Sequence, residues 1–158
     1  RHGFQKILFL NGHGGNANLL RSSVQQLRFE YDIDMVAASY WDFAITEIGE
    51  WRRSEVGGIN HACEMETSLM LALAQDHVQL DKAEDLYLER ATYLPADLTA
   101  GGPVTRAATF RELSPHGAIG APTLASKERG EALLETLTDR VATFLTELAG
   151  WENRKEER

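Results

Sequence analysis

A histidine followed by two glycines stands directly behind an apolar run near the start of the chain. The run covers residues 7–10 and leads into Asn11-Gly12-His13-Gly14-Gly15-Asn16. An apolar run bounded by glycines is typical of a buried parallel strand, and ligands and catalytic groups collect at the carboxyl ends of such strands. Asn16 is a good N-cap for a following helix. The strand, the turn and the helix are therefore predicted to bring one imidazole and several backbone N–H groups to a single point.

The glycine turn has two other interpretations that the residues alone leave open. Its composition is that of a phosphate cradle and equally that of a tight left-handed turn without a ligand. The spacing is not GxGxxG, and no Lys-Ser/Thr pair follows it as in a P-loop. A single histidine is as typical of a structural role as of a functional one.

A second group of chemically capable residues, His61, Glu64 and Glu66, lies in the segment Gly57–Ser68. The segment runs into helical spacing of apolar residues, and the helix dipole favours acids near a helix start. Because Glu64 and Glu66 are two positions apart, they point to different faces, and at most one is expected to reach a given site. Imidazole and carboxylate ligands suit Zn, Mn or Fe, so the segment predicts a metal and proton-transfer site. The alternative is an ordinary helix start with a capping histidine.

Taken in order, these motifs resemble the creatininase family of metal-dependent amidohydrolases. The motif Asn11–Asn16 comes first, the pair Tyr40-Trp41 follows a second apolar segment, and His61–Ser68 resembles the family's His-Ala-Gly-x-x-Glu-Thr-Ser element. Residues 117–130 resemble its late Gly-x-x-Gly-x-Pro, Ala-Ser and Gly segment. The resemblance spans nearly the whole chain, and the two histidine motifs in this order are a specific signal.

The resemblance implies a three-layer α/β/α fold with a mostly parallel sheet and a site for two divalent metals, Zn, Mn or Fe. It implies that a metal-bound water hydrolyses the C–N bond of a small cyclic amide, a formamide or a peptide-like substrate. The predicted metal ligands are His13 and Glu66, since Glu66 stands at the Glu-Thr-Ser position of the motif. The predicted catalytic residues are Glu64 and His61, which steadies the intermediate or passes a proton to the leaving nitrogen. The predicted substrate-binding residues are Gly14, Gly15, Asn16, Tyr40 and Trp41, with core packing as the alternative for the two aromatic residues.

Two glycines and a cysteine depart from the pattern of the family. Gly14 and Gly15 stand where creatininases proper have a tyrosine and a glutamate. This form resembles formylamino-pyrimidine deformylases and the peptidases that mature the mycofactocin precursor, so the exact amide substrate stays open. Cys63 stands where the family has glycine. A small buried residue is favoured there over a nucleophile paired with His61.

The family's earlier Gly-x-x-Glu-x-His-Gly segment and its downstream Asp have no counterpart in this sequence. In the family they supply three of five metal ligands. The chain is therefore predicted to be the C-terminal part of a longer enzyme, and residues 1–158 alone are predicted to have little hydrolase activity.

The elements that must position these residues alternate along the chain. The pattern predicts a strand over 6–11, a helix over 17–30 with Leu19, Leu20, Val24 and Leu27 on its inner face, and a strand over 34–39. Further on it predicts a polar helix or loop over 44–56, a helix up to about Ala74, an extended strand and loop over 75–98, a short strand over 109–113 and a last helix capped by Ser126. This alternation predicts a parallel sheet with helices on both faces. One domain is expected over 1–150, followed by a charged tail over 151–158.

Composition and charge argue against several classes of partner. The net charge of −8 and the pI near 5.1 disfavour nucleic acid and anionic membranes. No apolar stretch approaches the roughly 18 residues of a membrane span, and a single cysteine is compatible with the cytoplasm, where the protein is expected.

The resemblance implies a homo-oligomer, often a hexamer. The competing interpretations are a flavodoxin-like ligand-binding module without catalysis and an inactive remnant of the family.

Overall fold

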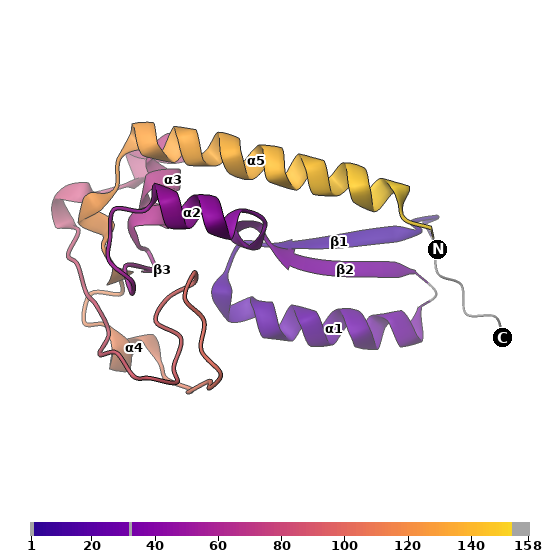
Figure 1. Ribbon diagram of the computed structural model, residues 1–158, viewed down its shortest axis with the longest axis horizontal. Coiled ribbons are helices and arrows are strands. Elements are labelled where there is room, and N and C mark those ends of the chain that lie inside the picture. The colour runs from indigo at the N-terminus through magenta and orange to yellow at the C-terminus, as the bar shows by residue number, and fades with distance from the viewer. Residues whose placement is uncertain (1, 32, 153–158) are drawn as a thin grey trace. The chain divides into compact units, whose positions relative to one another are not determined.

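A computed structural model describes residues 2–31 and 33–152 of the chain (Figure 1). The strands are β1 Lys6–Asn11, β2 Asp34–Ser39, β3 Ile59–His61 and β4 Ile119–Gly120. The α-helices are α1 Ala17–Glu30, α2 Ile45–Trp51, α3 Glu64–Ala74, α4 Phe110–Leu113 and α5 Lys127–Gly150. The short 3-10 helices are η1 Gly14–Asn16, η2 Tyr40–Ala44, η3 Gln75–His77, η4 Leu80–Lys82 and η5 Pro122–Leu124. Among these described residues, no helix combines the length and the apolar character needed to cross a bilayer.

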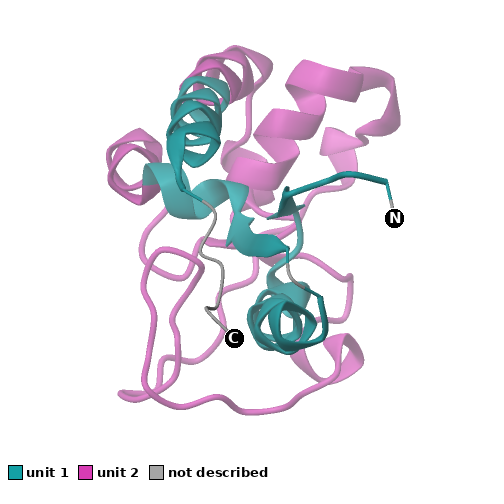
Figure 2. Cartoon of the chain, turned by 90° about the vertical axis from the view of Figure 1, so that its right-hand side faces the viewer, with its two compact units in different colours: residues 1–44, 137–158 teal, residues 45–136 magenta. Residues whose placement is uncertain are grey.

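The elements fall into two compact units, which Figure 2 colours separately. Unit 1 comprises residues 1–44 and 137–158, and unit 2 comprises residues 45–136, so α5 contributes to both. The single domain over 1–150 stays a prediction. The predicted tail over 151–158 lies outside the described residues from position 153 onward.

Unit 1 is built on the parallel pair β1 and β2, which align from Lys6 opposite Asp34 to Asn11 opposite Ser39. Parallel neighbours need a crossover connection, and α1 supplies it. Both strands end at the same edge, so the residues that follow them, from Gly12 onward and from Tyr40 onward, lie at the carboxyl ends of a parallel pair. The first apolar run predicts this parallel arrangement, but its prediction of a buried strand is wrong, because residues 6–9 are half-buried and Leu10 is 48% exposed.

Helix α1 turns part of its predicted inner face inward. Leu20, Val24 and Leu27 are half-buried, whereas Leu19 is 68% exposed. The prediction is wrong for Leu19. Successive residues point about 100° apart around a helix axis, so Leu19 falls outside the stripe that the other three form.

Unit 2 has a small apolar core in which Ile48, Ile59, Met65 and Leu133 are almost fully buried. Its strands β3 and β4 pair antiparallel, with Ile59 opposite Gly120. The predicted parallel alternation therefore does not extend to these two strands. Because β3 contributes the core residue Ile59 and ends at His61, burial of this strand sets the direction in which the chain enters the second motif.

Two segments of unit 2 differ from the prediction. The strand predicted over 109–113 is wrong, because Thr109 and Glu112 form a capping box that starts α4, with the Thr109 N–H donating to Glu112 at 2.6 Å. The extended strand predicted within 75–98 is also wrong. That segment contains η3, η4 and an isolated bridge between Leu86 and Gly120.

Gly130 allows α5 to approach α3 closely, and we expect this position to tolerate no side chain. A Cβ at Gly130 would lie 1.9 Å from the carbonyl oxygen of Ser68, whereas at Gly49 in α2 it would meet no described atom within 4 Å. Gly130→Ala is therefore expected to destabilise the protein by about 2 kcal/mol or more. Gly49→Ala is the matched control and is expected to be neutral or stabilising by up to about 1 kcal/mol. Urea unfolding of both variants measures the difference, and equal effects would contradict this packing.

Candidate active site

His13 stands at the carboxyl end of β1 in an extended conformation, and η1 follows it at once. The buried Asn11 fixes the turn, because its amide donates to the His13 carbonyl oxygen at 2.9 Å and to Ser39 Oγ at 3.0 Å. Its side-chain oxygen accepts from the His13 N–H at 3.1 Å. Residues 13–16 are exposed, and Asn16 occupies the N-cap of α1, although its side chain makes no capping hydrogen bond to a described residue. The predicted strand, turn and helix are thus confirmed, and His13 is accessible.

Gly15 lies against the imidazole of His13. A Cβ at position 15 would be 2.9 Å from His13 Nε2, whereas a Cβ at Gly12 would meet none of the described atoms within 4 Å. A flexible ring can move aside at little cost to the fold. Because His13 is a predicted metal ligand, we expect Gly15→Ala to leave the Tm nearly unchanged but to weaken Zn²⁺ binding about ten- to hundredfold, the typical cost of disturbing the orientation of a ligand.

Gly12→Ala is the matched control for this prediction. Zn²⁺ affinity of both variants is measured by competition with a chromophoric chelator. Equal affinities for Gly12→Ala and Gly15→Ala would show that the orientation of the His13 ring does not matter to metal binding.

The pair Tyr40-Trp41 lies in η2, directly after β2. The two ring centroids are 5.0 Å apart in an edge-to-face contact. Trp41 is 4% exposed, and Tyr40 is half-buried. This burial favours the alternative interpretation of Trp41, which is core packing. Of the two rings, Tyr40 has the larger accessible surface for contact with a substrate.

A tight turn links β3 to α3 and carries the second motif. Ala62, which follows His61, has a left-handed φ of 45°, a conformation that costs a non-glycine residue about 1 kcal/mol. The turn is held by Glu66 Oε2, which accepts from the Ala62 N–H at 2.6 Å, and by Thr67 Oγ1, which donates to the Ala62 carbonyl oxygen at 3.2 Å. The ring of His61 packs against Phe110, with centroids 4.3 Å apart. The turn therefore holds the carboxylate of Glu66 one residue away from His61, whose ring packs on Phe110.

A cleft of about 310 Å³ opens beside Glu66. Its lining includes Glu66, Ala62, Thr67, His77 and His116. Glu66 itself is half-buried, so its carboxylate both closes the turn and reaches an accessible surface. Of the two acids in the motif, Glu66 has the environment of a ligand.

Glu64 has the opposite environment, because it is 0% exposed. Its carboxylate accepts from the N–H groups of Arg53 and Ser54, each at 2.9 Å, and pairs with the Arg129 guanidinium at 3.3 Å. Arg129 in turn lies over the ring of Trp51, 4.4 Å from its centroid. A buried carboxylate with these donors cannot meet a substrate, so this placement does not fit the predicted catalytic role of Glu64. Its side chain turns back to the segment before β3 instead.

Cys63 occupies the N-cap of α3 and is buried. Burial raises the pKa of its thiol to about 11, so the thiol is protonated at neutral pH. A reactive cysteine needs a lowered thiol pKa. This environment favours the interpretation of Cys63 as a small buried residue that replaces the family's glycine.

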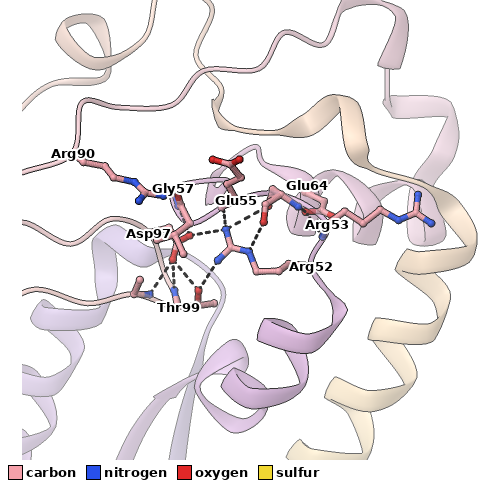
Figure 3. Close-up of polar contacts among 11 residues, drawn as sticks. Arg52, Arg53, Glu55, Gly57, Glu64, Arg90, Asp97 and Thr99 are labelled. Carbon is pink, nitrogen blue, oxygen red and sulfur yellow. Dashed lines mark hydrogen bonds and ion pairs between the residues drawn. The ribbon is translucent and has the colours of Figure 1, made fainter.

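Sequence reasoning singles out neither Asp97 nor Arg52, which form a buried ion pair at 2.9 Å (Figure 3). Asp97 also accepts from the Gly57 N–H at 2.7 Å and from the N–H and hydroxyl of Thr99 at 2.9 and 2.8 Å. Burial alone would raise the pKa of Asp97, but these hydrogen bonds and the charge of Arg52 outweigh it and lower that pKa. The available signal in the sequence is the Asp-x-Thr spacing of an Asx turn just after Pro95.

A family model for creatininase, described as creatinine amidohydrolase, matches residues 1–145. The chain belongs to the creatininase family. Creatinine amidohydrolase of Pseudomonas putida is 31% identical over 157 residues, which cover 93% of this chain and 57% of that protein. Mycofactocin precursor peptide peptidase of Mycobacterium ulcerans (strain Agy99) is 28% identical over 134 residues, 85% of this chain and 45% of that protein. The chain thus spans about half the length of the curated relatives it matches.

Solved structures show the same likeness. A candidate creatinine amidohydrolase from Bacteroides fragilis NCTC 9343 matches this creatininase-family chain with a TM-score of 0.78 at 25% identity, over 97% of this chain and 57% of the other. The predicted α/β class with a creatininase-like fold is confirmed. The roles of the individual site residues stay predictions, since these likenesses do not test them.

Proposed function

We propose that the complete natural protein is a metal-dependent amidohydrolase that cleaves a C–N bond in a small cyclic amide, a formamide or a peptide-like substrate. Family membership supports this proposal, as do two relatives named as a creatinine amidohydrolase and a peptide peptidase. The observation that carries it is the exposed His13, which Asn11 holds at the carboxyl end of a parallel strand. The creatininase-like fold argues against the alternative of a flavodoxin-like binding module.

The candidate metal ligands of this chain are His13 in unit 1 and Glu66 in unit 2. Their imidazole and carboxylate donors suit Zn or Mn, and solved creatininases include a Zn–Zn form of a mutant enzyme and a Mn form. In residues 2–31 and 33–152, no three His, Cys, Asp or Glu side chains gather into a metal site. The donor types fit a divalent metal, and we propose that each of the two residues holds a metal together with further ligands.

A divalent metal held by these residues would supply Lewis-acid activation of water and of the substrate carbonyl. His61 then donates a proton to the leaving nitrogen, with its ring held by Phe110 and by its place at the end of β3. Gly14 and Gly15 leave space for the substrate beside His13, and the half-buried Tyr40 is proposed to contact the substrate. Glu64 takes a structural role.

The class of partner follows from the same comparison. A solved mutant creatininase is complexed with creatine, which supports a small-molecule substrate for this protein as well. The cytoplasmic location, expected from the cysteine content, stays a prediction. The homo-oligomeric, often hexameric, state that the family resemblance implies also stays a prediction.

The experiment that tests this function starts from the complete protein stripped of metal by a chelator. The protein is reloaded with Zn²⁺ or Mn²⁺ and incubated with creatinine, a formylaminopyrimidine and a short peptide, and products are followed by mass spectrometry. We expect metal-dependent hydrolysis of at least one of the three. Full metal loading without hydrolysis of any of them would favour the inactive remnant and contradict the proposal.

A further inference from the structure

The segment 52–58 connects α2 to β3 and is held from one side by Asp97 (Figure 3). The side chain of Asp97 is 0% exposed, and one carboxylate oxygen both accepts from the Gly57 N–H at 2.7 Å and pairs with Arg52 at 2.9 Å. Its other oxygen accepts from Thr99 and from the Ala100 N–H at 2.9 Å. Asp97 therefore joins its own loop to a segment about forty residues earlier in the chain.

Arg52 uses its guanidinium to hold the same segment. Its Nε donates to the Ser54 carbonyl oxygen at 2.9 Å, and its Nη2 donates to the carbonyl oxygen of Glu55. Its Nη1 donates to Thr99 Oγ1 at 3.1 Å. The Arg52 side chain is 11% exposed, and its bonds to Ser54 and Thr99 are partly buried, where hydrogen bonds are stronger than at the surface.

The held segment leads directly into the second motif. Gly57 has a φ of 104°, a conformation for glycine, and the next residues enter β3. The loop of Asp97 also reaches the strand itself, because the Leu98 N–H donates to the Ile59 carbonyl oxygen at 2.9 Å. The chain from Gly57 to Ile59 is thus fixed at both ends by residues 97 and 98, and His61 lies two residues further on.

The opposite end of the motif is fixed by Glu64. Its carboxylate accepts from the N–H groups of Arg53 and Ser54, which belong to the same segment 52–58. His61 and Ala62 therefore lie on a short stretch whose two ends are bound to one rigid segment. Movement of that segment would displace the His61 ring and the turn that Glu66 closes.

We propose that the Asp97–Arg52 pair positions His61 for proton transfer in the amidohydrolase reaction without touching the substrate; this inference rests on the proposed function. A buried ion pair contributes little net stability, but removing one partner leaves the other charge unpaired. The benefit of this pair is the single geometry that it imposes on the segment. Asp97 and Arg52 are accordingly positioning residues.

The test uses Thr99, because its hydroxyl bridges the pair and can be changed without removing a charge. Thr99→Val keeps the shape but loses the hydroxyl, whereas Thr99→Ser keeps the hydroxyl. In the complete zinc-loaded protein we expect Thr99→Val and Asp97→Asn to lower kcat about tenfold or more, with KM changed less than threefold. Thr99→Ser, which keeps the hydroxyl, is expected to have a kcat within about twofold of the wild-type value.

The matched control is Asp85→Asn. Asp85 accepts from the N–H and hydroxyl of Thr123 at 3.1 and 2.8 Å, as Asp97 does from Thr99, but it is exposed and its partner Thr123 lies in η5 rather than in the segment 52–58. The kcat of the Asp85→Asn variant is expected to match that of the wild type. Hydrogen exchange of the peptide 57–66, read by mass spectrometry, is expected to rise in Thr99→Val and to stay unchanged in Asp85→Asn.

The possible results distinguish a failure of the positioning role from a failure of the proposed amidohydrolase function. An active wild type with unchanged kcat and unchanged exchange in Thr99→Val and Asp97→Asn would overturn the positioning role alone. A loss of kcat in Thr99→Ser as large as in Thr99→Val would also overturn it, because the hydroxyl would then be irrelevant. A wild type that binds zinc but hydrolyses no substrate of the panel would overturn the proposed function and this inference with it.

Discussion

Replacing His13 with alanine is expected to remove one of the two metals that the family resemblance predicts for the complete protein and to abolish amide hydrolysis. His13 is exposed, and its hydrogen bonds with Asn11 involve backbone groups that alanine retains, so the substitution removes the imidazole donor and keeps these bonds. Loss of an outer partner of a metal ligand typically costs about ten- to hundredfold in affinity or activity. Loss of a direct ligand is expected to cost more than about a hundredfold.

Metal content by plasma mass spectrometry and the rate of hydrolysis at saturating Zn²⁺ measure this effect. His2→Ala is the control, since His2 is exposed and lies outside both motifs. If His13→Ala kept both the stoichiometry and the rate of the wild type, His13 would not be a ligand.

Glu66→Gln and Glu64→Gln are expected to fail in different ways, although the same change is made two positions apart. Glu66 lines the cleft, and its amide replacement can still accept from the Ala62 N–H. Glu66→Gln is therefore expected to lose bound metal while the free energy of unfolding changes little. Glu64 is buried against Arg129, and breaking such a pair costs about 3–5 kcal/mol. Glu64→Gln is therefore expected to lose stability and to keep its metal.

Urea unfolding and metal content of the folded fraction measure the two effects on the same samples. The variants serve as controls for each other, because the chemical change is identical. Metal loss in Glu64→Gln at unchanged stability would mean that the ligand register is shifted by two residues.

Much of unit 1 could be predicted from local pattern. The apolar runs of β1 and β2 and the helical spacing of α1 are strong signals, and the glycines of the first motif mark the turn. The sequence does not fix which side of α1 is buried. Leu19 and Leu20 are equally apolar, and their burial depends on where the strands lie. In unit 2, α4 replaces the predicted strand because the capping box of Thr109 and Glu112 outweighs the apolar residues beside it.

The sequence predicts the motifs of the candidate site. It predicts less well how buried each site residue is and which groups surround it. The spacing of Glu64 and Glu66 predicts that they face different ways, and the structure agrees. Spacing alone does not say which acid is buried, because that depends on the backbone of residues 53 and 54 and on Arg129. Asp97 is harder still, since its partners Arg52 and Gly57 lie about forty residues away and no motif links them.

The central claim is that His13 and Glu66 are each a metal ligand in the complete protein. An anomalous difference map at the zinc edge, from crystals of the complete protein grown with Zn²⁺, tests it most directly. We predict a peak about 2.0–2.2 Å from an imidazole nitrogen of His13 and a second peak at that distance from a carboxylate oxygen of Glu66, with none at Glu64. Peaks that avoid both His13 and Glu66, or a zinc ion bound to Glu64, would contradict the account.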